Sequence, residues 1–146
     1  MKNRITILNR EYKIDKTKGT IVCILTCAPN FKNIDDAWSF DWGDFHPWTK
    51  KFPTYFTKKS RKFGWCAFTV IGKAKCNEVD TFNEITGRRI AESKARLKAY
   101  KVGEYIWECF QNMFEDYLYA CIKTKEACKE EFNNELYHLN TLSNDN

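Results

Sequence analysis

Hydrophobic and polar positions alternate along the first thirty residues in a pattern typical of β-strands. Residues 5–14 (ITILNREYKI) and 20–28 (TIVCILTCA) are rich in Ile, Val and Thr, and the turn-forming run DKTKG separates them. This pattern predicts an antiparallel hairpin. In its second strand Cys23 and Cys27 share one apolar face with Ile21 and Leu25, while Val22, Ile24 and Thr26 form the other. Because both faces are apolar, we expect this strand to be central, with a third strand over residues 64–75.

An aromatic segment separates the second strand from the third. Residues 29–63 hold eight Trp, Phe and Tyr side chains between Trp38 and Phe56, interrupted by Gly43, Pro47 and Pro53. The segment is too long for a simple turn, and its first part is acidic whereas its second part is basic. It is expected either to fold back as a hairpin of its own or to cover a face of the sheet.

A helical period begins at Asp80, which is a suitable N-cap. The first helix is predicted to run toward Tyr100, with a stripe of small residues at Gly87, Ala91 and Ala95 that favours close packing against another backbone. A break or a bend is expected near Gly103. An amphipathic helix through residues 106–121 and a weaker one over 126–142 follow. The sequence therefore predicts one α+β domain over residues 1–146: an N-terminal antiparallel β-sheet part, about 1–76, then a helical part, about 80–142, of two to three α-helices.

Composition supports a folded chain, because 43% of its 146 residues are hydrophobic and 16% are aromatic. The seven cysteines are an odd number, and the charged start MKNRITILNREYK lacks the apolar core of a secretory signal. No apolar run approaches the roughly 20 residues of a membrane span. These features predict a cytoplasmic protein with reduced thiols, no membrane association and no cofactor.

Charge favours anionic partners, since the net charge is +5. The cations gather in two segments, and a solvated surface is the plain alternative for both. The members of the first are Lys50, Lys51, Lys58, Lys59, Arg61 and Lys62, and those of the second are Arg88, Arg89, Lys94, Arg96 and Lys98.

Catalysis has little support in the sequence. The chain contains two histidines, His46 and His138, and lacks a nucleophile elbow, a P-loop and a paired-carboxylate motif. Asp41, Asp44 and His46 could hold a divalent cation for phosphoester cleavage, although a mixed aromatic loop of this kind is more often structural. We therefore expect a binding protein without a metal site.

One face of the first predicted helix suits an anionic ligand. At 100° per residue, five of its side chains project within roughly 60° of one another: Phe82, Arg89, Ser93, Arg96 and Tyr100. Arginine forms bidentate bonds to phosphate, serine bonds an oxygen, and an aromatic ring stacks on a base. The alternative is that the two aromatic side chains belong to the core and the arginines are solvated. The basic run 58–62 could supply an opposite wall or a nucleic-acid surface.

Three stretches suggest a family. The hairpin KGTIVCILT, the strand end GKAKC and the run DTFNEITGRRIAESKARLKAY resemble the first-described Thoeris anti-defence family of phage proteins. These sequester cyclic ADP-ribose isomers made by bacterial TIR enzymes. The resemblance covers about residues 12–28 and 64–101. Its aromatic position falls on Phe82, its helix glycine on Gly87, and its basic residue on Lys94, where the family has arginine.

The resemblance implies a sponge that binds its ligand without cleaving it, in the cytoplasm of an infected bacterial host. It implies an N-terminal antiparallel sheet with C-terminal helices, a homodimer that can assemble to a hexamer, and pockets between protomers that hold a cyclic ADP-ribose isomer or a cyclic oligonucleotide. The ligand-binding set is then Phe82, Arg89, Ser93, Lys94, Arg96 and Tyr100. The less favoured alternatives are a nucleic-acid-binding or anti-CRISPR-type inhibitory module that uses residues 50–62, and a structural phage or host interaction protein.

Overall fold

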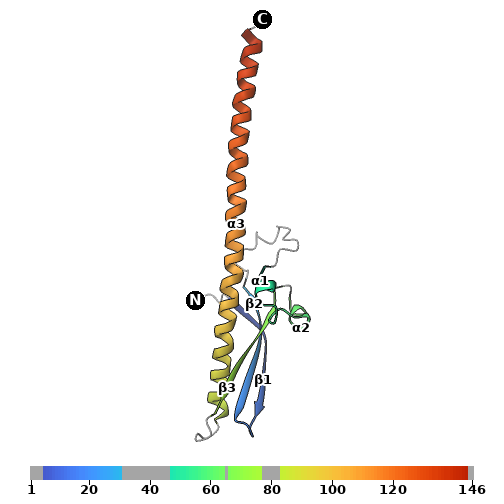
Figure 1. Cartoon of the computed structure of the whole chain (residues 1–146), viewed down its shortest axis with the longest axis vertical. Coiled ribbons are helices and arrows are strands. Elements are labelled where there is room, and N and C mark those ends of the chain that lie inside the picture. The colour runs from blue at the N-terminus through green and yellow to red at the C-terminus, as the bar shows by residue number, and fades with distance from the viewer. Residues whose placement is uncertain (1–4, 31–46, 65, 77–82, 145–146) are drawn as a thin grey trace. The chain divides into compact units, whose positions relative to one another are not determined.

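The computed structural model describes residues 5–30, 47–64, 66–76 and 83–144 (Figure 1). Three strands and three helices lie within these ranges. They are β1 (Ile5–Asp15), β2 (Thr20–Pro29), α1 (Pro47–Lys51), α2 (Lys58–Arg61), β3 (Phe68–Lys75) and α3 (Glu84–Asn144). The predicted α+β class, with an N-terminal antiparallel sheet followed by helix, is confirmed.

The chain divides into two compact units, residues 1–107 and residues 108–146. The first contains the sheet, α1, α2 and the beginning of α3, whereas the described part of the second is α3 alone. That residues 1–146 act as one domain stays a prediction.

The sheet has the order β1–β2–β3, and both pairs are antiparallel. The predicted hairpin is confirmed: Ile14 lies opposite Ile21, and the turn is closed by Asp15, whose carboxylate accepts bonds from the backbone of Thr17 and Lys18. Gly19 has a φ of 61°, a left-handed conformation that glycine adopts without strain. The hairpin is therefore specified locally by its turn residues.

The central position of β2 is also confirmed, because β2 pairs with both other strands. Cys23 and Cys27 share a face, as predicted, and both are fully buried together with Ile21 and Leu25. In β3 the buried residues Phe68, Val70 and Ala74 alternate with more exposed ones. These buried side chains of the two strands form the core of the first unit together with buried residues of α1 and α3.

The described part of the aromatic segment, residues 47–63, contains two short helices and no hairpin. Trp48 is buried in α1, and the Phe56 ring packs on Phe68 with centroids 5.5 Å apart. The backbone N–H of Thr69 donates to the carbonyl of Tyr55. This segment therefore packs on the beginning of β3, while residues 31–46, including Asp41, Asp44 and His46, lie outside the described residues.

Helix α3 corrects two details of the prediction. Its described start is capped by Asn83, whose side-chain oxygen accepts the backbone N–H of Thr86 at 3.1 Å, while Asp80 lies outside the described residues. Of the predicted break or bend near Gly103, the break is wrong: one helix continues through this residue, in place of two or three. A Cβ at Gly103 would lie 2.5 Å from Cδ1 of Ile5, so this glycine permits close packing on β1.

Candidate functional site

The predicted small-residue stripe of α3 does bring two backbones together. A Cβ on Gly72 of β3 would overlap the carbonyl oxygen of Ala91 and lie 2.5 Å from the backbone nitrogen of Ala95. A Cβ on Gly87 would lie 2.5 Å from Cδ1 of Ile21. The expectation that close packing accompanies the lower helix propensity of Gly87 is confirmed. The flanks of α3 are thereby placed directly beside the outer strands.

An open groove of about 630 Å³ lies where α3 passes β3. Four lysines, an aliphatic and an aromatic side chain contribute to its lining, which also includes Gly72 and Glu104. We call it the lysine groove, and its six characteristic residues are Lys73, Lys94, Leu97, Lys98, Tyr100 and Lys101. The described part of its lining carries four cationic side chains against one carboxylate, so it attracts anions.

Two of these lysines also contact the outer edge of β3. The Lys94 ammonium donates to the carbonyl of Lys73 at 3.0 Å, and the Lys98 ammonium donates to the carbonyl of Ile71 at 2.6 Å. Each bond satisfies a backbone acceptor on the side of β3 where no strand of the described residues pairs, and lysines at a sheet edge discourage pairing with another strand. An ammonium has three donors, so each lysine keeps further donors for a ligand.

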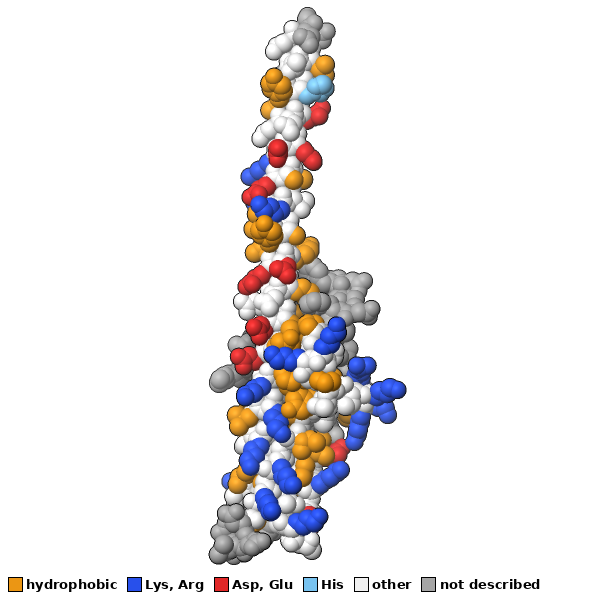
Figure 2. Space-filling model, in the orientation of Figure 1, with side chains coloured by type: hydrophobic (Ala, Val, Ile, Leu, Met, Phe, Trp, Pro, Cys, Tyr) orange, Lys and Arg blue, Asp and Glu red, His pale blue; other side chains and the backbone are white. Residues whose placement is uncertain are grey.

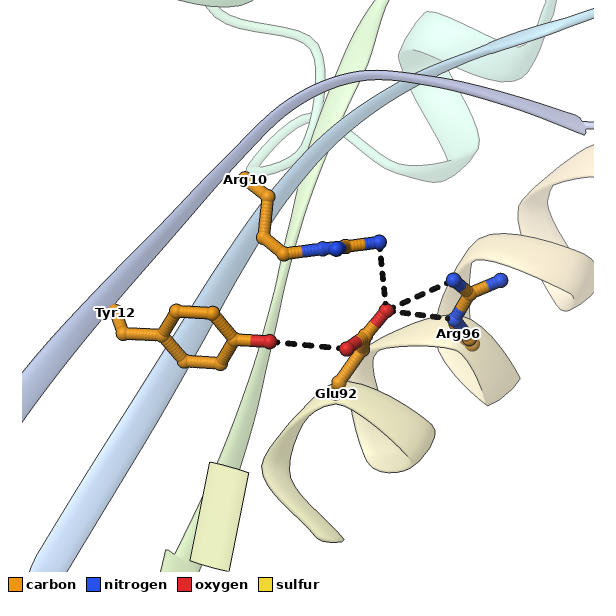
Figure 3. A network of polar contacts seen from close by, with 4 residues as sticks. All are labelled: Arg10, Tyr12, Glu92 and Arg96. Carbon is orange, nitrogen blue, oxygen red and sulfur yellow. Dashed lines mark hydrogen bonds and ion pairs between the residues drawn. The ribbon is translucent and has the colours of Figure 1, made fainter. Parts of the chain in front are cut away.

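A charged network occupies the other flank of α3, beside β1 (Figure 3). Arg10 and Tyr12 project from β1 toward Glu92 and Arg96 of α3. The Glu92 carboxylate accepts the Tyr12 hydroxyl at 2.9 Å, an Arg10 nitrogen at 2.8 Å, and two Arg96 nitrogens at 3.0 and 2.8 Å. One carboxylate thus holds two guanidinium groups and ties the helix to the strand.

Electrostatics within this network follow from its geometry. Partial burial of Glu92 opposes ionisation, but the bonds from Arg96 and Tyr12 and the charge of Arg10 outweigh it, so its pKa lies below the ordinary value. Burial, together with the bond to Glu92, raises the pKa of Tyr12 to about 12. The bond to Glu92 raises the pKa of Arg96, and a bond to the Tyr100 side chain adds to this. The network is therefore charged at neutral pH.

The six residues predicted as a ligand site are only partly brought together. Lys94 and Tyr100 line the lysine groove, and Tyr100 also contacts Arg96. Arg96 itself uses two of its nitrogens on Glu92. Arg89 and Ser93 are exposed and do not line the groove, and Phe82 lies outside the described residues.

Sequence reasoning missed part of the groove. Lys94, Lys98 and Lys101 recur at spacings of four and three residues, which places them on one face of a helix. That signal was available, because the spacing can be counted in the sequence. The contribution of Lys73 could not be found in this way, since it depends on the register of β3 against α3.

No family model, curated protein or solved structure matches this chain.

The described residues can also be assessed for metal binding, membrane crossing and thiol reactivity. Within residues 5–30, 47–64, 66–76 and 83–144, no three His, Cys, Asp or Glu side chains are grouped so that they could share a metal ion. Over the same described ranges, no helix combines the length and apolar character that a bilayer crossing requires. None of the seven cysteines forms a disulfide within the described residues, and burial raises the pKa of the Cys27 thiol to about 11, which makes it a poor nucleophile at neutral pH.

Proposed function

We propose that this protein binds a cyclic ADP-ribose-type signalling nucleotide in the lysine groove and holds it without chemical change. The observation that carries the proposal is the convergence of four lysines and the Tyr100 ring on one open groove. Ammonium groups bind phosphate oxygens as point charges, and a tyrosine ring offers a stacking surface for a base. The volume of about 630 Å³ falls within the range of small-molecule sites.

The groove is better suited to retention than to catalysis. Among the described residues, its lining contains cations and a single carboxylate, Glu104, and includes neither a cysteine nor a histidine. A lone carboxylate lacks the second acid or base that most hydrolytic mechanisms require. This lining supports a binding protein.

The biological role follows the resemblance of the sequence to the Thoeris anti-defence family. In that role the protein is a phage sponge, which lowers the free concentration of an immune signal in the bacterial cytoplasm and so silences its effector. A sponge works by stoichiometry and needs tight binding. Because the lysine groove is open, enclosure by a second subunit of a homodimer, with assembly to a hexamer as a further step, would exclude water and strengthen the charge-assisted bonds.

Calorimetry with purified protein and cyclic ADP-ribose isomers tests the proposal, followed by recovery of the ligand after heat denaturation. We expect tight binding and intact released ligand. Lys94→Ala/Lys98→Ala should weaken binding at least tenfold, and Tyr100→Leu should weaken it by a similar factor through lost stacking. The matched control is Lys58→Ala in α2, which removes a charge outside the groove and should leave affinity unchanged.

The variant Arg89→Ala distinguishes binding in the lysine groove from binding at the arginine face that the sequence predicts. Arg89 belongs to the predicted arginine face but does not line the groove, so the groove predicts unchanged affinity. Loss of binding in Arg89→Ala with retention in Lys94→Ala/Lys98→Ala would move the site to the other flank of α3. Absence of binding to every isomer would overturn the proposed ligand.

Nucleic acid is the second candidate ligand, because the six cations of residues 50–62 are all exposed. Figure 2 shows Lys and Arg side chains over much of the lower part of the view, where the strands lie and α3 begins. Binding to DNA or RNA would fall steeply with salt and would be lost in Lys58→Ala/Lys59→Ala. The same titrations therefore distinguish the two functions.

A further inference from the structure

The second unit presents an apolar surface that no described residue covers. Every residue from 115 to 144 is exposed, including Leu118 at 60% and Phe132 at 67%. Figure 2 shows apolar side chains interspersed with charged ones along this part of α3. Helices gain most of their stability in water from packing an apolar face, so we expect this surface to pack against a partner.

Eight exposed positions of this helix follow a strict seven-residue repeat. They alternate at spacings of three and four, which is the a/d pattern of a coiled coil. We call them the seam: Leu118, Cys121, Lys125, Cys128, Phe132, Glu135, Leu139 and Leu142. Six are apolar, and the two charged members carry opposite signs.

The two charges decide how a second copy can pair. In a parallel, in-register dimer each seam residue faces its own counterpart, so Lys125 would face Lys125 and Glu135 would face Glu135. Both layers would bury like charges, which is strongly unfavourable.

An antiparallel arrangement removes both conflicts at once. The seam is symmetric about Glu130, because Lys125 and Glu135 lie five residues on either side of it. A two-fold axis at residue 130 therefore places each Lys125 opposite the Glu135 of the other copy. The remaining layers are all apolar: Leu118 with Leu142, Cys121 with Leu139, and Cys128 with Phe132.

Neighbouring positions widen the same surface. Ile122 and Leu136, both exposed, lie one position beyond Cys121 and Glu135 and are themselves placed almost symmetrically about residue 130. The same axis brings Ile122 of one copy beside Leu136 of the other. A shallow hollow between Lys125, Cys128 and Phe132 lies at the centre of the seam, where an antiparallel partner would insert a side chain.

We propose that two copies of this chain associate through the seam as an antiparallel coiled coil, with Lys125 of each paired to Glu135 of the other. The inference does not rest on the proposed ligand, since no seam residue lines the lysine groove. It specifies a self-association surface, its orientation and the residues that select that orientation.

Charge reversal in the full chain tests the pairing by sedimentation analysis. Lys125→Glu places two glutamates in each charged layer and should raise the dimer dissociation constant about 100-fold, and Glu135→Lys should do the same. The double variant Lys125→Glu/Glu135→Lys restores opposite charges and should restore the dimer. Lys123→Glu, the same charge change on the outer face of the helix, is the matched control and should leave association unchanged.

Cross-linking checks the orientation independently. With 1.5 Å per residue, the two Cys121 thiols of the antiparallel pair are about 27 Å apart along the axis, whereas Cys121 faces position 139. In a Cys128→Ser background, Leu139→Cys should therefore give a 121–139 disulfide between chains on mild oxidation with oxidised glutathione, identified by peptide mass spectrometry. Cys121–Cys121 cross-links, a monomeric wild type at about 100 μM, or a double reversal that fails to restore the dimer would each overturn the proposal.

Discussion

The two parts of helix α3 use apolar residues in opposite ways. In residues 84–107 the buried positions are mostly small, with Ala91, Ala95 and Ala99 against the sheet, whereas in residues 115–144 large side chains such as Phe132 and Leu139 are exposed. Small residues let a helix lie against a backbone that is already present in the chain. Large residues at a seven-residue repeat instead fill the space between two helices.

One helix thus packs against two different partners: the sheet of its own chain and, in the dimer that we propose, a second copy. In its first part the spacing of small residues is four, which matches a single close contact with Gly72. In its second part the period is seven, and the symmetry of the charges about Glu130 selects a second copy. The chain divides into two units after residue 107, so the small-residue stripe lies in the first unit and the seam in the second.

Gly72→Ala should have the largest effect, because it removes the close approach on which the first part depends. The new Cβ would overlap the Ala91 carbonyl and approach the Ala95 nitrogen, and neither backbone atom can rotate away. We expect a loss of about 3 kcal/mol in the free energy of unfolding, measured by urea denaturation. Lys75→Ala, an exposed change in the same strand, should stay within about 0.5 kcal/mol. An unchanged midpoint in Gly72→Ala would mean that α3 does not lie against β3.

Glu92→Gln tests the charged network that ties the first part to β1, and its effect should be smaller. The carboxylate is 19% exposed, but Arg10 and Arg96 are 41% and 40% exposed, so solvent screens the loss. We expect about 1–2 kcal/mol of destabilisation by urea denaturation. Glu84→Gln, which breaks the single exposed pair with Arg88, is the matched control and should cost less than about 0.5 kcal/mol. Equal effects of the two substitutions would show that Glu92 contributes no more than a surface pair.

The same variant has a defined pH signature. Folding lowers the pKa of Glu92 below its ordinary value of 4.5, so the folded state favours the ionised form. The stabilisation is therefore present above the unfolded pKa and is lost as the pH falls through the folded pKa. The stability difference between wild type and Glu92→Gln, measured by urea denaturation from pH 7 to pH 3, should be constant down to about pH 5 and shrink below it. A difference that grew toward acid would contradict the assigned pKa direction.

Much of the first unit could be predicted from the sequence. Local signals specified the hairpin, the central strand and the small-residue stripe of α3, since each depends on a period or a turn within a few residues. Gly103 was misread because a glycine in a helical pattern has the same sequence signature whether it ends the helix or admits a neighbour. Only the position of Ile5, almost a hundred residues earlier, distinguishes a glycine that ends the helix from one that allows close packing.

The candidate site was harder to predict for the same reason. Lys94 and Tyr100 could be found on one helix, but their joining with Lys73 depends on which strand lies beside that helix. Arg96 was expected to bind a ligand, whereas two of its nitrogens donate to Glu92, one helical turn earlier, which also pairs with Arg10 from a distant strand. A helical wheel gives the direction of a side chain but does not identify the residue that it meets.

The smallest effect should come from Gly103→Ala, which tests how closely the helix approaches β1. Alanine improves helix propensity by about 1 kcal/mol, but its Cβ would lie 2.5 Å from Cδ1 of Ile5, the flexible end of a half-buried side chain. The two effects should offset each other, leaving stability within about 0.5 kcal/mol of wild type. Ile5→Val removes the methyl that the new Cβ meets, so the double variant should be more stable than the two single changes predict. Urea denaturation of all four proteins should give a coupling of at least about 0.5 kcal/mol, because the two sites share one contact. Additive effects would mean that Ile5 does not lie on Gly103, and the continuity of α3 through this glycine would then need a different cause.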